Sequence, residues 1–238
     1  SRVLCDAAGN VYVATIGNFG IQRSGNGGAS WTTITPTGLT NRVTEMRISN
    51  TGRMHIVCGY RNSGTSGYRY TDNPSTVTEN SWTEPVTTFP TAFNSELAVS
   101  GNILYVLPAN SSYRTPTIYK SIDGGATWNL VNLPLTADRN KHCPNDIEIG
   151  SDNSVWVATK NSILYGDGGG KIFSSTDGNT FTQRHEVPSG KRTQIGLSAT
   201  NANKIYVLVE DSTTGEADIY LTTNGFTSDT RLAEPAAI

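Results

Sequence analysis

The fold is decided by the stretch Ser121-Ile122-Asp123-Gly124-Gly125-Ala126-Thr127-Trp128, because it has the form Ser-x-Asp-x-Gly-x-Thr-Trp and weaker copies recur along the chain. One copy runs from Ser24 to Trp31, and another, one residue shorter, from Ser175 to Phe181. Two degenerate copies are Thr71-Asp72-Asn73, with a delayed Trp82, and Thr222-Thr223-Asn224-Gly225-Phe226. A motif that recurs at a nearly constant period indicates a repeat architecture.

The spacing of the copies gives the size of the repeat. With Asn26, Asp72, Asp123, Asp177 and Asn224 taken as equivalent, subtraction gives intervals of 46, 51, 54 and 47 residues. An interval of this length matches one blade of a β-propeller. We therefore expect an all-β chain, a β-propeller of about five four-stranded blades of roughly 47–54 residues, which is either complete or part of a larger propeller.

The chain is expected to form a single domain, residues 1–238. Within each interval, short apolar or alternating runs are separated by turns rich in Gly, Asn and Ser, as in antiparallel sheets. The 24 Gly and the low charged fraction of 16% also suit a sheet protein with many tight turns. The approximate blades are residues 1–37, 38–88, 89–135, 136–188 and 189–238.

The repeated motif resembles the Asp-box, or bacterial neuraminidase repeat, of sialidases, xyloglucan-active endoglucanases, sortilin-type ectodomains and a photosystem assembly factor. The resemblance covers the repeat only and implies a structural role in the turn between the third and fourth strands of a blade. Side-chain oxygens of Asp, Asn, Ser and Thr can accept hydrogen bonds from the turn's backbone N–H groups, and Gly supplies a positive φ. The final Trp or Phe is expected to be an apolar plug between neighbouring sheets.

The residues expected in this structural role are Ser24, Asn26, Gly28, Trp31, Ser121, Asp123, Gly125, Trp128, Ser175, Asp177 and Phe181. A calcium-binding or catalytic role for Asp123 is the alternative.

Composition limits the partners and the location. The formal net charge is −2 and the basic residues are scattered, so no nucleic-acid partner is expected. No apolar run reaches the roughly 20 residues of a membrane span, and the first residues do not form a signal peptide. A chain that starts at Ser1 is consistent with removal of a targeting segment or with a longer protein. The richness in Thr, Ser, Asn and Gly favours an extracellular, periplasmic or cell-surface location.

No metal or cofactor is expected. The three Cys are an odd number with no metal-binding spacing, and the three His lie in different blades. The loop at 166–171 lacks the Gly-Lys-Ser/Thr ending of a phosphate loop.

A binding site is expected where the innermost strands begin and where the long variable loops lie, on the face opposite the repeated turns. Charged and amide side chains at these strand entries, and Tyr and Arg in the loops, suit a polyhydroxylated or charged ligand or a protein partner. The alternative is a solvated channel with paired charges. The residues expected to bind a ligand are Arg42, Asn94, Asn145, Arg192, Tyr60, Tyr113, Arg114 and Tyr165.

Catalysis is the weaker hypothesis. The Arg-Ile-Pro type motif of sialidases is absent. An endoglucanase would need two carboxylates across a cleft, and the best candidates are Glu96 and Asp146.

The sequence favours an exported propeller that acts as a recognition or scaffolding module for an extracellular glycan or protein. One alternative is a glycoside hydrolase, either sialidase-like or endoglucanase-like. Another is a structural assembly domain whose partners are further blades or domains of the same protein.

Overall fold

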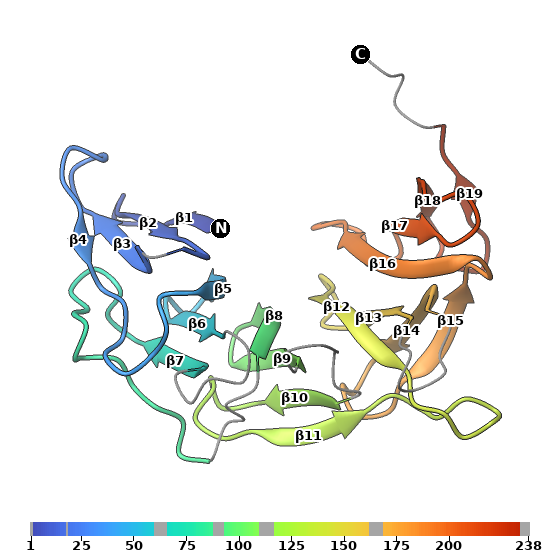
Figure 1. The fold of residues 1–238 in the computed structure, drawn as a ribbon, viewed down its shortest axis with the longest axis horizontal. Coiled ribbons are helices and arrows are strands. Elements are labelled where there is room, and N and C mark those ends of the chain that lie inside the picture. The colour runs from blue at the N-terminus through green and yellow to red at the C-terminus, as the bar shows by residue number, and fades with distance from the viewer. Residues whose placement is uncertain are drawn as a thin grey trace. The chain divides into compact units, whose positions relative to one another are not determined.

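The structure is a computed structural model that describes residues 2–17, 19–59, 66–87, 93–109, 117–161 and 169–233, apart from the side chains of 93–95 and 109. The described residues form strands and turns and contain no helix, so the all-β prediction is confirmed (Figure 1). The chain divides into two compact units. The first comprises Ser1–Ser112 and Tyr119–Leu130, and the second Tyr113–Ile118 and Val131–Ile238.

The strands form antiparallel sheets in chain order, which we number as blades. Blade one holds β1 (Arg2–Cys5), β2 (Val11–Ala14), β3 (Ile21–Ser24) and β4 (Thr32–Thr33); blade two holds β5 (Val43–Ile48), β6 (Met54–Cys58) and β7 (Gly67–Thr71). Blade three holds β8 (Phe93–Ser100), β9 (Ile103–Ala109), β10 (Thr117–Ser121) and β11 (Asn129–Asn132). Blade four holds β12 (Cys143–Ile149), β13 (Val155–Lys160), β14 (Lys171–Ser175) and β15 (Thr182–Glu186). Blade five holds β16 (Gly190–Leu197), β17 (Ile205–Asp211), β18 (Ala217–Thr222) and β19 (Thr230–Arg231).

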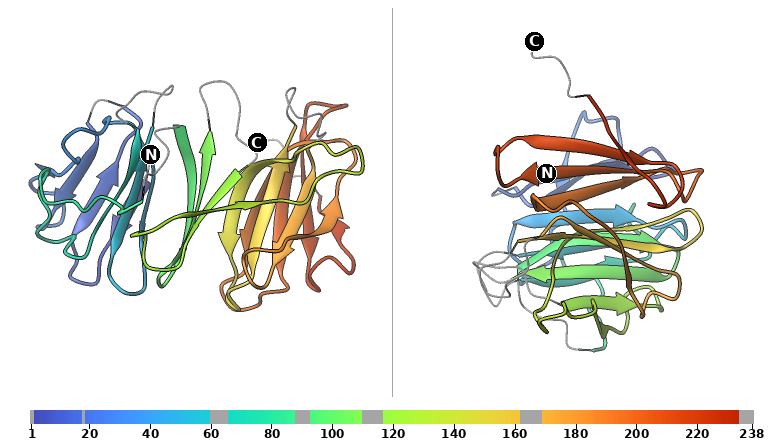
Figure 2. Two further views of the ribbon diagram at one scale, coloured as in Figure 1. Left: turned by 90° about the horizontal axis from the view of Figure 1, so that it is seen from below. Right: turned by 90° about the vertical axis from the view of Figure 1, so that its right-hand side faces the viewer.

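This arrangement is that of a β-propeller, as the sequence predicts. Blade two differs from the expected four strands among the described residues, because its fourth strand is reduced to one bridge between Tyr70 and Thr83. In the second unit, the β16–β18 sheet is stacked on the β12–β14 sheet (Figure 2). The two sheets are joined at one edge through the pair Lys160–Arg192.

The repeated turns are held by hydrogen bonds from the residues that define the motif. The Ser121 hydroxyl donates to Asp123 Oδ1 at 2.8 Å and accepts the Gly125 N–H at 2.9 Å. Asp123 Oδ1 also accepts the Thr127 N–H at 2.9 Å. Although partial burial acts in the opposite direction, these bonds and the Thr127 hydroxyl lower the pKa of Asp123. The carboxylate is therefore committed to the turn.

The same pattern occurs in the other turns with Asn or Asp at the acceptor position. Asn26 Oδ1 accepts the Ser30 N–H at 2.9 Å, and Asn224 Oδ1 accepts the Ser228 N–H at 3.0 Å. Asp177 Oδ1 accepts the Thr180 N–H at 2.8 Å. An amide oxygen replaces a carboxylate here because the turn requires only an acceptor.

The second copy of the motif is offset from the sequence alignment. Thr71 pairs with Met54, and its hydroxyl accepts the Asn73 N–H at 3.1 Å, so Asn73 takes the place that we assigned to Asp72. Asp72 instead accepts from Arg53 Nε at 2.6 Å. The assignment of Asp72 was wrong because adjacent Asp and Asn residues are chemically equivalent acceptors in sequence alone.

The aromatic residues that end the motif do not share one role. Trp128 is 7% exposed and meets the Tyr68 ring edge-on at 5.0 Å, while Phe181 is 6% exposed. Trp31, however, is 44% exposed, so it is not the apolar plug that we expected. The delayed Trp82 packs against the core between blades one and two and donates to the carbonyl of Ile34 at 2.6 Å.

Candidate functional site

The entries of the innermost strands contain β-bulges. The register shifts between Val43 and Glu45 in β5, between Asn94 and Glu96 in β8, and between Pro144 and Asp146 in β12. A bulge redirects the side chains that follow it. Three blades thus place a carboxylate directly after a bulge, which is where the sequence predicted functional residues.

In blade two this carboxylate, Glu45, forms ion pairs within the fold. Glu45 is fully buried and accepts from Arg2 Nε at 2.7 Å and from Arg47 Nη1 at 2.8 Å. Because Arg2 belongs to β1, the pair links blade one to blade two. Removing one partner of such a buried pair would leave an uncompensated charge. Glu45 is therefore part of the scaffold.

In blade four, the side chains of Asn145 and Asp146 form hydrogen bonds within the fold. Asn145 is 1% exposed, and its Nδ2 donates to the carbonyl of Thr193 at 2.7 Å. Asp146 accepts the Ile147 N–H at 3.0 Å through Oδ1 and the Ile195 N–H at 2.8 Å through Oδ2. The structure thus places both residues in the interior, against the inner strand of blade five. Hydrogen bonds that satisfy the backbone decide this placement.

The remaining predicted residues lie in different parts of the chain. Arg42 and Glu96 are partly buried and belong to the first unit, whereas Asp146 belongs to the second. The predicted loop residues Tyr60, Tyr113, Arg114 and Tyr165, and the side chain of Asn94, lie outside the described residues. The catalytic pairing of Glu96 with Asp146 therefore stays a prediction.

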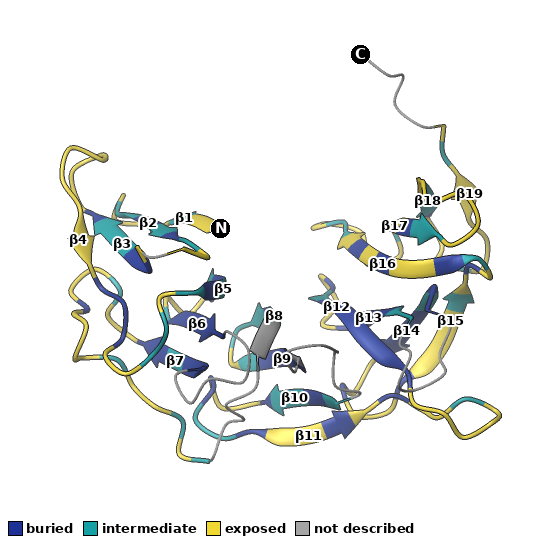
Figure 3. Ribbon diagram, in the orientation of Figure 1, coloured by how far each residue is buried: buried dark blue, intermediate teal, exposed yellow. Residues whose placement is uncertain are grey.

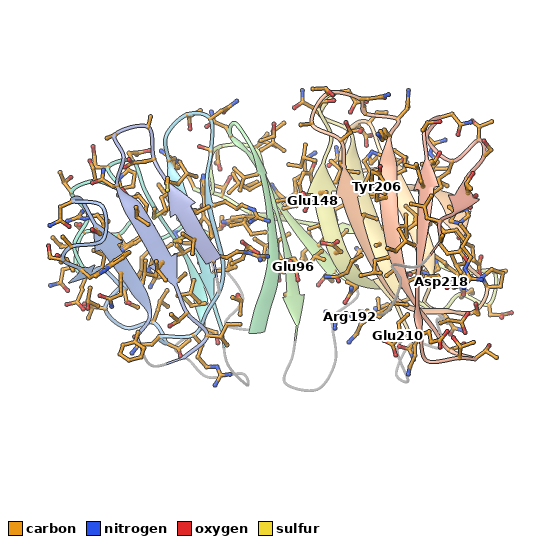
Figure 4. The ribbon with its side chains drawn as sticks, turned by 90° about the horizontal axis from the view of Figure 1, so that it is seen from above. Glu96, Glu148, Arg192, Tyr206, Glu210 and Asp218 are labelled. Carbon is orange, nitrogen blue, oxygen red and sulfur yellow. The ribbon has the colours of Figure 1, made fainter. Side chains whose placement is uncertain are left out.

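Arg192, one of the predicted ligand residues, lines an open hollow. A cavity of about 150 Å³ is lined by Arg192, Gln194, Leu208, Glu210 and Ala217 on one face of blade five. It shares Gln194 and Leu208 with a second cavity of about 340 Å³ that continues toward Tyr206. Figure 4 shows Arg192 and Glu210 at one end of these strands and Tyr206 toward the other.

We call this continuous surface the blade-five groove, defined by Arg192, Gln194, Gly196, Tyr206, Leu208, Glu210, Ala217 and Ile219. The strand register sets its rows, pairing Arg192 with Glu210 and Gln194 with Leu208. Burial alternates along β16, whereas β12 is mostly buried (Figure 3). The groove is hollow partly because Gly196 contributes no side chain.

The chemistry of the blade-five groove is apolar in the middle and charged near its ends. Tyr206 is 41% and Leu208 42% exposed. Lys204 Nζ lies 5.7 Å from the Tyr206 ring centroid, and Lys191 Nζ lies 3.1 Å from Glu210 Oε1. Exposed aromatic and aliphatic side chains with a polar rim are typical of surfaces that bind protein.

One carboxylate beside this surface has a strongly shifted pKa. The Ser189 hydroxyl and the backbone N–H groups of Thr214 and Thr213 lower the pKa of Asp211 to about 2. Asp211 thus stays ionised as the acceptor that orders its loop, and it is unsuited to act as a general acid.

Of the groove residues, the sequence analysis named Arg192 but missed Tyr206, Leu208 and Ile219. The alternation of β17 showed that the strand has two faces. It did not show which face is covered.

Another hollow of about 340 Å³ is lined by Asn132, Leu133, Pro134, Leu135, Lys141 and His142, with His142 packed on Phe173.

The described residues contain no cluster of three or more His, Cys, Asp or Glu that could hold a metal ion. Within the same residues, no helix could span a membrane.

Comparison with known proteins identifies the fold. No family model and no curated protein matches the chain. An ancestral GH74 enzyme is similar in structure, with a TM-score of 0.71 and 17% identity over 97% of this chain and 30% of its own. The GH74 xyloglucanase from Xanthomonas campestris is similar with a TM-score of 0.64 and 15% sequence identity, and the match covers 96% of this chain and 37% of the xyloglucanase. YCF48 bound to the D1 peptide is similar with a TM-score of 0.60 and 13% sequence identity, and the match covers 89% of this chain and 59% of YCF48. The chain thus spans less than two thirds of each, and the class of protein is a β-propeller.

Proposed function

We propose that this chain is a recognition and scaffolding module that acts outside the cytoplasm and binds a protein partner through the blade-five groove. The observation that carries the proposal is the contrast between Asp146, which is bound within the fold, and Arg192, which faces an open groove with Tyr206 and Leu208. The likeness to YCF48, which has been solved with a bound peptide, supports a protein partner. The Ser, Thr, Asn and Gly content supports the location.

A protein fits this groove better than a glycan does. Sugars bind to aromatic faces surrounded by planar polar groups, and the groove offers one aromatic ring, Tyr206, beside the aliphatic Leu208 and Ile219. Apolar side chains of a polypeptide would cover this aliphatic area, while its charged groups met Arg192 and Glu210. The glycan hypothesis requires other contacts, such as those predicted for the variable loops.

Glycoside hydrolysis is less well supported, despite the similarity to GH74 enzymes. The reaction needs one carboxyl group as general acid and another as base or nucleophile. Both oxygens of Asp146 accept backbone N–H bonds. A carboxylate held in this way is poorly placed to exchange a proton with a substrate.

The test has two arms. In the first, a displayed peptide library is selected on the chain, and the selected peptides are measured against Leu208→Arg and a matched exposed control, Leu130→Arg. We expect the Kd of the selected peptides to rise at least tenfold in Leu208→Arg and to stay unchanged in Leu130→Arg. In the second, xyloglucan and sialosides are tested for hydrolysis and binding. Hydrolysis that is lost in Glu96→Gln, or glycan binding that is lost in Arg192→Ala, would contradict the proposal.

A further inference from the structure

The strand registers define equivalent positions in the blades. In blades one, two, four and five, the first residue of the turn motif pairs with the first residue of the second strand: Ser24–Val11, Thr71–Met54, Ser175–Val155 and Thr222–Ile205. The residues one and three positions after this first residue of the second strand lie on one face of the sheet. The residue of the third strand that pairs with the later of the two lies on the same face, so each blade has a set of three side chains there. The sets are Tyr12, Ala14 and Ile21 in blade one, His55, Val57 and Tyr68 in blade two, Trp156, Ala158 and Ile172 in blade four, and Tyr206, Leu208 and Ile219 in blade five.

In blades one, two and four, this set is covered by the blade that follows. Tyr12, Ala14 and Ile21 share a core with Met46, Met54 and Ile56 of blade two. Val57 and Tyr68 share a core with Leu97, Leu104 and Val106 of blade three, and His55 is fully buried. Trp156, Ala158 and Ile172 share a core with Ile195, Ile205, Val207 and Val209 of blade five. In these three blades, the set is therefore the face that packs against the next blade.

In blade five the same set lines the blade-five groove. Tyr206 is 41% exposed, whereas its equivalents Tyr12, His55 and Trp156 are 0%, 0% and 5% exposed. The residue types are also those of a packing face, with an aromatic at the first position and aliphatics at the others. Branched aliphatic side chains on a facing sheet would cover this surface, as they do in the core between blades four and five.

The polar residues specify the charge of the covering sheet. Arg2 of blade one pairs with Glu45 of blade two, and blades two to four carry an acid at the equivalent bulge position, namely Glu45, Glu96 and Asp146. By register, Arg2 corresponds to Gln194, and Arg192 lies two residues earlier on the same face. A sheet with an acid at that position would place its carboxylate opposite Gln194, one alternate position along the same face from Arg192, whose long side chain could reach it.

We propose that the blade-five groove is the docking face for a sixth four-stranded sheet of the same repeat, which lies outside these 238 residues and carries aliphatic side chains at alternate positions and an acid at the entry of its innermost strand. The inference rests on the proposed function and identifies the polypeptide that the groove binds as a further sheet of the same intact protein, which corresponds to the scaffolding part of that function. The sheet packs face to face on Tyr206, Leu208 and Ile219, and its acid pairs with Arg192.

A second copy of this chain fits less well. The free outer face of blade one includes Val3, Val11 and Val13, which could supply the aliphatic side chains, and Val3 is 65% exposed. However, its innermost strand carries Arg2 where the proposal requires an acid, and Arg2 is paired with Glu45. Docking of this strand would bring two basic residues together.

Hydroxyl-radical footprinting with mass spectrometry tests the proposal directly. It would compare the 238-residue chain with the intact protein from its natural source, and the equivalent buried residue Tyr12 serves as an internal reference. In the 238-residue chain, we expect Tyr206 to be labelled at least tenfold faster than Tyr12. In the intact protein, we expect a mass above 25.5 kDa and labelling of Tyr206 as slow as that of Tyr12. Equal labelling of Tyr206 in both samples would overturn the inference.

Variants of the 238-residue chain identify other occupants. Leu208→Arg should shift the Tm by less than about 2 °C, because the face is open. Ala158→Arg, at the equivalent covered position, should yield no folded protein. A large loss of Tm in Leu208→Arg would mean that the chain covers its own groove, and a dimer in sedimentation that Leu208→Arg dissociates would mean a second copy. Either result overturns the sixth sheet, whereas glycan binding through Arg192 would instead contradict the proposed function.

Discussion

Asp146 Oδ2 accepts the backbone N–H of Ile195 at 2.8 Å, so a side chain at the entry of β12 fixes the innermost strand of the next sheet. Its other oxygen accepts the N–H of Ile147, the next residue in its own strand. One carboxylate therefore satisfies buried donors in two blades, and its role in this structure is to join them.

Replacement of Asp146 should reduce stability. Asp146→Ala leaves the N–H groups of Ile147 and Ile195 without this acceptor in a buried site, which should cost about 2–4 kcal/mol of unfolding free energy. Asp146→Asn keeps one acceptor oxygen and should cost about half as much. Urea denaturation monitored by tryptophan fluorescence would measure both. Asp138→Ala, an exposed loop carboxylate, is the control and should change little; equal effects at both sites would contradict the account.

Trp128 and Trp31 occupy the same position of the repeated motif but should differ in energetic weight. Trp128 is 7% exposed, contacts Tyr68, and donates from Nε1 to the Gly125 carbonyl at 3.0 Å, so Trp128→Ala should cost about 3–5 kcal/mol. Trp31 is 44% exposed, and Trp31→Ala should cost less than about 1 kcal/mol. Thermal unfolding of the two variants would compare them directly. A near-neutral Trp128→Ala would show that this residue does not act as a plug.

The difference between these two tryptophans shows what the sequence could predict. The turns at Ser24, Ser121 and Ser175 were predictable because their hydrogen bonds join residues within a few positions of one another. Burial of the final aromatic depends instead on a residue distant in sequence. Trp128 is covered by Tyr68 of blade two. Nothing within the motif encodes that contact.

The same limit applied to the candidate site. The sequence placed Asp146, Asn145 and Arg192 correctly at strand entries, because hydrophobic alternation marks where strands begin. It could not show that Asp146 turns toward a backbone N–H of another strand while Arg192 faces an open groove. Those orientations follow from the bulges and from the stacking of the sheets. In the sequence, Tyr206, Leu208 and Ile219 resemble ordinary core residues, because alternation does not show which face of a sheet another sheet covers.

Gly125 should be far less tolerant of substitution than Gly27, although both have positive φ. A Cβ on Gly125 would lie 1.8 Å from the Tyr68 hydroxyl oxygen, whereas a Cβ on Gly27 would meet nothing within 4 Å. Gly27→Ala should cost about 1–2 kcal/mol from backbone strain alone. Gly125→Ala should cost about 2–4 kcal/mol, because Tyr68 must also move. Chemical denaturation would measure the difference, and equal losses would show that the contact with Tyr68 relaxes without cost.

His55 should make the stability of the first unit depend on pH. The ring is fully buried, its Nδ1 lies 2.7 Å from the Tyr68 hydroxyl, and its Nε2 has no hydrogen-bond partner among the described residues. Burial, assisted by the positive charge of Arg53, lowers the pKa of His55 from 6.5 to about 3. The unfolded chain therefore binds a proton that the folded chain does not, in the window between these two values. The stabilising contribution is fully present above pH 6.5 and is lost as the pH falls toward 3.

Between pH 6.5 and pH 4.5 this single group should remove about 2 kcal/mol of unfolding free energy. Urea denaturation at several pH values would measure the slope. His55→Leu keeps an apolar side chain in the site and removes the titrating group, so its slope should be shallower than that of the parent chain by about one proton. The carboxylates, which also lose stabilising interactions in acid, are common to both proteins and cancel in the comparison. Parallel slopes for the two proteins would mean that His55 is protonated in the folded chain, and that Tyr68 tolerates a charged ring beside it.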